Sequence, residues 1–469
     1  MRCRFLAAVL WLPVLVLSLR AAAPAPPLPD TFDVPAIDAF LAAQVRQPHR
    51  VGFSVAIVQD GRLVLAQGYG QRSLAERRSV ETNTIFAIGS VSKQFTCAAI
   101  LLLAEDGRLS VNDPVAKFYP DLTRARDITL LDLMNHVSGY PDYYPLDFVD
   151  RRMLQPIAED DLLRQYAGGR LDFEPRNKYS YSNTGYILLG RIVEKASGEN
   201  LGSFLARRIF QPLGMTQTFY ELGAADPRLA TGYHAFALGD PEVIAPEAAG
   251  WLRGAGGIHS TPLDLMKWNL ALMNGQVLKP ASFALMTSPR QLSSGRVSEY
   301  GCGLSVKTQA GRLILSHNGA VSGFNAYSAM IPSTRSAVVM FCNLEGGMSS
   351  LPGQIVSLLL KEPAQVPVVA GLTAAETVKA VFAQMQDEKV SRAQFAAEFN
   401  HYLTDQKLTN AAARLKSYGR PAKVEVLSIH ERGGLEVTTT RLTFASGELR
   451  VLMYRRVDGT IEQFFVSRE

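Results

Sequence analysis

The chain has 469 residues, of which 47% are hydrophobic and 19% charged, and its formal net charge is +5. This composition is typical of a globular protein and excludes a largely disordered chain, while the length favours two domains over one. Lysine and arginine are scattered without a basic run, so nucleic-acid binding is not predicted.

The first residues have the pattern of a secretory signal peptide. Two arginines precede an apolar run at 5–19, and three alanines at 21–23 offer a cleavage site. An uncleaved membrane anchor is the alternative, but the run is short, a proline interrupts it and an arginine closes it. We expect residues 1–23 to be removed on export to the periplasm or the medium. Their loss takes away three arginines and lowers the net charge from +5 to +2.

Hydrophobic periodicity predicts an α+β domain over residues 31–361. Helical patterns cover 33–45, 90–105, 184–197, 201–210 and 351–360, and the stretch from 113 to 275 is mostly helical. Alternating patterns predict strands at 52–58, 62–69, 304–307, 313–316, 324–331 and 337–342. Strands therefore lie near both ends of this domain. We expect one antiparallel sheet assembled from the two ends, with a mostly helical insert between them.

The pattern starts afresh after a proline-containing linker at 362–367. Residues 371–469 predict a small α+β domain of helices followed by four strands. The helices are expected at 373–386, 392–402 and 410–418, and the strands at 424–430, 435–444, 448–454 and 461–467. This order resembles nuclear-transport-factor-2-like modules. The sequence does not distinguish between three roles for this domain: a lid, a wall of the substrate site or a dimerisation module.

Cysteine and histidine usage argues against cofactors. Beyond Cys3 in the signal peptide, the chain has Cys97, Cys302 and Cys342, which is too sparse for a disulfide framework. One bridge between Cys302 and Cys342 is an open alternative to buried thiols. The seven histidines form no pair at metal-ligand spacing, so we predict no metal and no cofactor.

Ser90 and Lys93 are the first candidates for chemistry. A Ser-x-x-Lys spacing places both side chains on one face of a helix. A serine hydroxyl needs an adjacent base to act as a nucleophile, and a lysine with a depressed pKa can serve. The plain alternative is a helix-capping serine beside a solvated lysine. About one such spacing is expected by chance from the composition of a chain of this length.

Two further motifs follow along the chain. Tyr181 and Asn183 are two apart, so an extended segment points both to one side, where the hydroxyl can relay a proton and the amide can hold a carbonyl. The alternatives are packing and a helix cap. His317 and Gly319 end a predicted strand, where a glycine permits close approach of a ligand to the backbone. Here the alternative is a hairpin turn at Asn-Gly.

In this order and at this spacing, the three motifs resemble the class C β-lactamase family, which also contains DD-peptidases, D-aminopeptidases and esterases. The sister set of class A enzymes is Ser-x-x-Lys, Ser-Asp-Asn and Lys-Thr-Gly. Further segments fit the same pattern. They are 133–139, 212–215, 256–261, 300–304 and 323–324.

The resemblance implies a role for each residue. Ser90 would be the nucleophile, and Lys93 and Tyr181 would share the proton transfers, with the identity of the acylation base left open. Asn183 would orient the substrate amide. The backbone N–H groups of Ser90 and Ala320 would form an oxyanion hole. The motif also implies substrate binding by His317 and Gly319.

His317 departs from β-lactamases, which carry a lysine at this position. Histidine is only partly charged near neutral pH, so we expect weak or absent β-lactam hydrolysis. The leading hypothesis is an exported serine hydrolase that acts on D-amino-acid peptides, as a DD-carboxypeptidase does, or on small esters. A true β-lactamase, a sensor that acylates without turnover and a structural protein with a dead site are the alternatives. The expected partner is a small-molecule or peptide substrate, with no stable membrane span and the oligomeric state left open.

Overall fold

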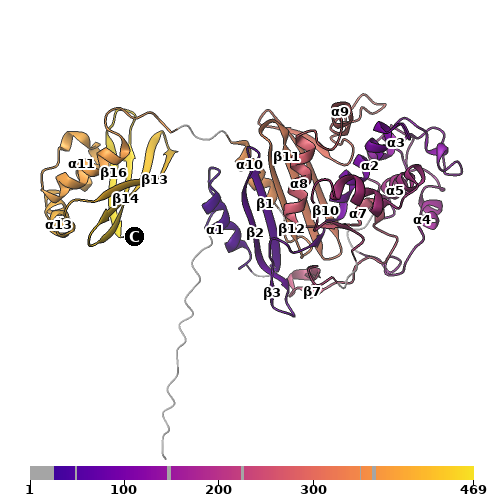
Figure 1. Cartoon of the computed structure of the whole chain (residues 1–469), viewed down its shortest axis with the longest axis horizontal. Coiled ribbons are helices and arrows are strands. Elements are labelled where there is room, and N and C mark those ends of the chain that lie inside the picture. The colour runs from indigo at the N-terminus through magenta and orange to yellow at the C-terminus, as the bar shows by residue number, and fades with distance from the viewer. Residues whose placement is uncertain are drawn as a thin grey trace, which may run out of the picture. The chain divides into compact units, whose positions relative to one another are not determined.

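The computed structural model describes residues 26–47, 50–144, 149–222, 226–348, 350–361 and 366–468. The predicted signal peptide lies outside these residues. The chain divides into two compact units between Lys361 and Glu362 (Figure 1). Among the described residues, no helix combines the length and apolar character needed to cross a bilayer.

A seven-stranded antiparallel sheet organises the first unit, in the order β3-β2-β1-β12-β11-β10-β9. Its central pairing joins β1 to β12, with Phe53 opposite Cys342 and Val58 opposite Ala337. The two ends of the unit therefore form one sheet, as predicted. The strands are β1 (Gly52–Gln59), β2 (Arg62–Ser73), β3 (Arg78–Ser79), β9 (Ser305–Gln309), β10 (Arg312–Val321), β11 (Phe324–Ile331) and β12 (Ser336–Cys342).

Both faces of this sheet are covered. Val55 and Ile57 on β1 pack into a core with α1 (Val34–Gln44) and α10 (Leu351–Leu360). Ala56 and Val58 point the other way, into a larger core shared with the helical region. Alternate residues of a strand face opposite sides, so a strand buried on both faces has a nearly continuous apolar sequence. Figure 1 shows α1 and α10 on one side of the sheet and α8 on the other.

The helical region between the strands carries most of the site. Its helices are α2 (Lys93–Glu105), α3 (Leu130–Met134), α4 (Glu159–Tyr166), α5 (Asn183–Ser197), α6 (Leu201–Leu205), α7 (Arg253–Gly256), α8 (Pro262–Met273) and α9 (Pro280–Met286). A one-turn 3-10 helix, η1 (Gly89–Ser92), leads into α2, and a π-helical turn at Ala206–Phe210 completes the helix predicted at 201–210. Short strands β4 (Phe86–Ala87), β8 (Ile258–Ser260) and β5 (Phe219–Tyr220) form a small sheet, and β6 (Tyr233–His234) pairs with β7 (Glu242–Val243).

The second unit follows the predicted order of helices and then strands. Its four-stranded meander runs β13-β14-β15-β16, and its core joins strand residues to the helices. Arg455 and Glu436 form a buried ion pair on neighbouring strands. Arg455 also donates to the Leu372 carbonyl just before α11, which links the sheet to the start of this helix. The elements are α11 (Ala374–Gln386), α12 (Ala397–Tyr402), α13 (Asp405–Leu415), β13 (Lys423–Arg432), β14 (Leu435–Phe444), β15 (Gly447–Arg455) and β16 (Ile461–Arg468).

The three cysteines in the described residues are buried free thiols. Cys302 and Cys342 are therefore not bridged in this structure. Burial raises the pKa of both thiols to about 12, so they remain protonated at neutral pH. Each behaves as a small apolar side chain of the core.

Candidate active site

Ser90 and Lys93 lie together where η1 passes into α2. Gly89 begins this turn with a φ of +50°, a conformation that glycine adopts without the steric cost of a Cβ. The turn places Ser90 and Lys93 on one face, with 3.0 Å between Lys93 Nζ and Ser90 Oγ. The structure therefore brings the first motif together as a hydrogen-bonded pair.

The Lys93 ammonium is fully buried and has two further acceptors. Its Nζ lies 2.7 Å from Asn183 Oδ1 at the start of α5, and 2.7 Å from the Ala255 carbonyl oxygen in α7. Burial lowers the pKa of Lys93 to about 7, and the nearby Asp142 charge opposes this effect only in part. A substantial fraction of the amine is therefore neutral at physiological pH.

Tyr181 covers this pair from the segment before α5. The Lys93 Nζ lies 4.8 Å from the centre of the Tyr181 ring. The Tyr181 hydroxyl is buried and makes no hydrogen bond within the described residues. Burial raises the pKa of Tyr181 well above its usual range. The nearby Ser90 side chain offsets only part of this rise, because it favours the phenolate. The hydroxyl is therefore protonated at neutral pH and available as a donor.

Asn183 links the lysine to a carboxylate. Its Oδ1 accepts from Lys93, and its Nδ2 donates to Asp142 Oδ2 at 3.2 Å. The backbone N–H of Asn183 donates to Asp142 Oδ1 at 2.9 Å, which caps the start of α5. The side chain is held in one orientation at the edge of the cleft, and Asp142 uses only one of its two amide hydrogens.

The third motif lies within a strand and forms no turn. β10 extends to Val321 and pairs with β11, and the turn follows at Ser322–Gly323. β9 pairs with β10 only as far as Ser316, so no strand of this sheet covers that edge from His317 onward. The hairpin alternative for Asn-Gly is therefore wrong, because Asn318 and Gly319 both lie within β10 and pair with β11.

Gly319 permits the close approach of β10 to the serine turn. A Cβ at this position would lie 2.0 Å from the Ile88 carbonyl oxygen and 3.2 Å from the Ser90 nitrogen. A Cβ on Gly89 would in turn lie 2.9 Å from the Ala320 nitrogen. The backbone nitrogens of Ser90 and Ala320 thus come from two segments in tight contact, and both residues line the same cleft.

His317 is buried, and both of its ring nitrogens have partners. Nδ1 lies 2.5 Å from the Asn318 carbonyl oxygen, and Nε2 lies 2.7 Å from the Tyr300 hydroxyl. Because a carbonyl only accepts, we assign the proton to Nδ1 and let Tyr300 donate to Nε2. Burial and the Lys93 charge lower the pKa of His317 to about 3. The imidazole is neutral at neutral pH and presents no cation to a substrate.

Two clefts of about 1000 Å³ each meet at Tyr181, His317 and Asn318. The first cleft contains Ser90, and its charged lining residues are Asp142, Asp172 and Glu345. The second cleft is mainly basic. Its charged lining residues are Lys178, Arg296, Lys307 and Glu299.

The sequence did not identify three residues of the site: Asp142, Tyr300 and Ala255. Asp142 and Tyr300 fix the orientation of Asn183 and His317, and the Ala255 carbonyl holds Lys93. Tyr300 belongs to a segment already noted for its resemblance, but nothing in the sequence signals a contact from Ala255. Tyr144 also lines the first cleft, and Tyr143 lines a small pocket beside Ser90, whereas the buried Tyr140 donates to the Thr123 carbonyl.

A serine paired with a buried lysine beside an open strand edge defines a serine hydrolase with a β-lactamase-like fold. The family model described as Beta-lactamase matches residues 37–359. The chain belongs to the Beta-lactamase family, as its motifs indicated, and it is a serine hydrolase.

The relatives of this chain include penicillin-binding proteins and D-aminopeptidases. Penicillin-binding protein 4* of Bacillus subtilis (strain 168) is 29% identical over 315 residues, which cover 64% of this chain and 69% of that protein. A D-aminopeptidase of Brucella anthropi is 26% identical over 459 residues, which cover 93% of this chain and 82% of that protein.

Solved structures agree on the fold. D-amino acid amidase from Ochrobactrum anthropi SV3, in complex with L-phenylalanine amide, is 26% identical with a TM-score of 0.58, covering 69% of this chain and 96% of that one. The octameric penicillin-binding protein homologue from Pyrococcus abyssi is 20% identical with a TM-score of 0.62, covering 93% and 100%. At that identity the second likeness shows the fold alone.

Proposed function

We propose that this chain is an exported hydrolase whose Ser90 attacks an amide or ester carbonyl and forms an acyl-enzyme. The observation that carries the proposal is the pairing of Ser90 Oγ with the buried Lys93 Nζ at 3.0 Å. Residues 1–23 would direct export, and residues 31–361 would form the catalytic domain. Residues 371–469 would form a separate module.

Lys93 acts as the base of acylation. A neutral amine has two N–H donors and one lone pair. With the donors directed at Asn183 Oδ1 and the Ala255 carbonyl, the lone pair faces Ser90 Oγ and accepts its proton. The depressed pKa of Lys93 supplies this neutral form near pH 7.

Tyr181 serves the leaving group. Its phenol is neutral, so it donates a proton to the departing nitrogen or oxygen as the bond to the carbonyl carbon breaks. The Lys93 ammonium then returns a proton to the phenolate, which restores both groups. In deacylation the same groups activate a water molecule, and water takes the place of the leaving group.

Backbone N–H groups of Ser90 and Ala320 stabilise the oxyanion. The tight contact of β10 with η1 at Gly319 places both groups in one cleft. In other enzymes one donor of this kind contributes about 3–4 kcal/mol to the transition state. Gly319 therefore contributes to catalysis indirectly, because the absence of a Cβ lets β10 approach η1.

The charges of the two clefts favour a zwitterionic substrate. An α-ammonium group suits the carboxylates around Ser90. A terminal carboxylate suits Lys178 and Arg296 in the second cleft, where Lys307 is already paired with Glu299 at 3.3 Å. A short D-amino-acid peptide carries both charges, and relatives named D-aminopeptidase and D-amino acid amidase support this class. Neutral His317 offers no fixed cation, which disfavours efficient β-lactam turnover.

An active-site probe followed by a substrate panel tests the proposal. A fluorophosphonate is expected to label the wild type and not Ser90→Ala, and equal labelling of both would refute the nucleophile. The panel consists of D-Ala-D-Ala, a D-amino acid amide, a p-nitrophenyl ester and a chromogenic cephalosporin. Repeated turnover of the peptide or the amide supports a hydrolase. One acylation per molecule with no turnover would instead make the protein a sensor.

A further inference from the structure

Arg253 begins α7 in an unusual backbone conformation. Its φ is +37°, in the left-handed region that residues with a Cβ rarely adopt. Such a conformation persists where surrounding contacts impose it, and it often occurs near functional sites. Contacts of Arg253 therefore help to fix the start of the short α7 helix.

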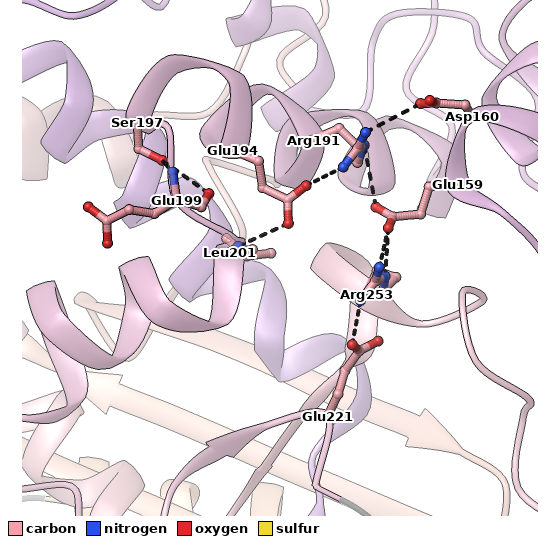
Figure 2. A network of polar contacts seen from close by, with 9 residues as sticks. All are labelled: Glu159, Asp160, Arg191, Glu194, Ser197, Glu199, Leu201, Glu221 and Arg253. Carbon is pink, nitrogen blue, oxygen red and sulfur yellow. Dashed lines mark hydrogen bonds and ion pairs between the residues drawn. The ribbon is translucent and has the colours of Figure 1, made fainter.

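The Arg253 side chain supplies those contacts (Figure 2). Its guanidinium donates to Glu159 at the start of α4, with 2.8 Å between Nε and Oε1, and it also pairs with Glu221 just after β5. The Glu159 side chain is only 11% exposed. One planar cation thus joins three segments that are far apart in the sequence.

The network continues along α5 through Arg191. Its guanidinium lies 3.8 Å from Glu159, 3.7 Å from Asp160 and 2.5 Å from Glu194. Figure 2 shows Arg191 and Arg253 on either side of Glu159. Arg191 shares this carboxylate with Arg253, but within the described residues its ion pairs involve α4 and α5 only.

α7 connects the network to the catalytic lysine. The Ala255 carbonyl, two residues after Arg253, accepts from Lys93 Nζ, and the Gly254 carbonyl accepts from Thr96 Oγ1 at 2.7 Å. α7 has only four residues, so a shift of its first residue moves both carbonyls. The Ala255 carbonyl is one of the two acceptors that leave the lone pair of a neutral Lys93 facing Ser90.

We propose that Arg253 is a positioning residue for acylation: its ion pairs with Glu159 and Glu221 hold α7 in the strained turn that presents the Ala255 carbonyl to Lys93. The inference rests on the proposed role of Lys93 as the base. Arg253 itself touches neither Ser90 nor Lys93 and acts only through the turn.

The test measures the rate of fluorophosphonate labelling of Ser90 from pH 5.5 to 9 in the full chain. Arg253→Met is expected to lower the plateau rate at least tenfold. It is also expected to move the midpoint of the pH profile downward, because the Lys93 ammonium loses an acceptor. Arg253→Lys, which keeps one cation, recovers part of the rate. Arg191→Met is the matched control and is expected to keep both the plateau and the midpoint.

A purely structural role would lower the melting temperature of both arginine variants and leave the midpoint in place. An unchanged midpoint in Arg253→Met, or an equal shift in Arg191→Met, overturns the proposal. If Arg253→Met fails to fold, Glu221→Ala removes one ion pair from outside α7. It is expected to slow labelling about two- to fivefold, in line with a partly exposed ion pair, and an unchanged rate overturns the proposal.

These outcomes are distinct from a failure of the proposed function. If wild type and Ser90→Ala are labelled equally, Ser90 is not the nucleophile. If labelling depends on Ser90 and Arg253→Met behaves as the wild type, only the positioning role is wrong.

Discussion

The buried Lys93 predicts a specific pH dependence of acylation. With a pKa of about 7, half of the amine is neutral at pH 7, whereas an unperturbed lysine near 10.5 would be neutral in roughly three molecules of ten thousand. Burial thus raises the reactive fraction roughly a thousandfold by this arithmetic. Part of the gain is offset because a weaker base accepts a proton less readily.

The acylation rate is therefore expected to rise about tenfold between pH 6 and pH 8 and then to level off. Stopped-flow measurement of the first turnover of a p-nitrophenyl ester gives this rate without interference from deacylation. Ser90→Ala supplies the background at each pH. A rate that is flat over this range, or one that rises only above pH 9, would refute Lys93 as the base.

The same pKa predicts a stability effect of known sign. The folded-state pKa of Lys93 is lowered, so between about pH 7 and 10.5 the unfolded chain binds a proton that the folded chain lacks. The free energy of unfolding then rises with pH across this window. Below pH 7, Lys93 is protonated in both states, and the free-energy cost of its buried charge no longer changes with pH. Relative to Lys93→Met, the wild type is expected to gain stability between pH 7 and pH 9 in urea unfolding. A difference independent of pH would contradict the depressed pKa.

Three further changes have expected outcomes. Gly319→Ala forces a methyl group to within 2.0 Å of a backbone carbonyl oxygen, so fluorophosphonate labelling should slow by about 100-fold, whereas Gly353→Ala, with nothing within 4 Å, should not slow it. Arg296→Gln in the basic cleft should raise KM for D-Ala-D-Ala by about two- to fivefold and leave the KM of a neutral ester unchanged. Arg455→Met leaves the Glu436 carboxylate buried and unpaired, which should cost the second unit about 3–5 kcal/mol in urea unfolding followed by limited proteolysis.

Local pattern located many of the main elements of this chain, although it ended β10 (Arg312–Val321) at residue 316 and began α13 (Asp405–Leu415) at residue 410. The helices at 33–45 and 351–360 and the strands at 52–58 and 324–331 lie where periodicity placed them. Periodicity succeeds because each element buries one face or both, and burial of a face requires apolar residues at a regular spacing along the local sequence. The order of the three motifs also indicated the family.

The sequence by itself determined which residue types were available: a serine, a lysine three residues on, a tyrosine, an asparagine and a strand glycine. Only the tertiary structure decided their chemical states. His317 is neutral because it is buried beside Lys93, and Lys93 is partly neutral because burial removes its water. The Ala255 carbonyl reaches Lys93 through α7, across 162 positions of sequence. Protonation states and long-range contacts of this kind depend on which segments pack around a group. A local sequence pattern does not contain this information.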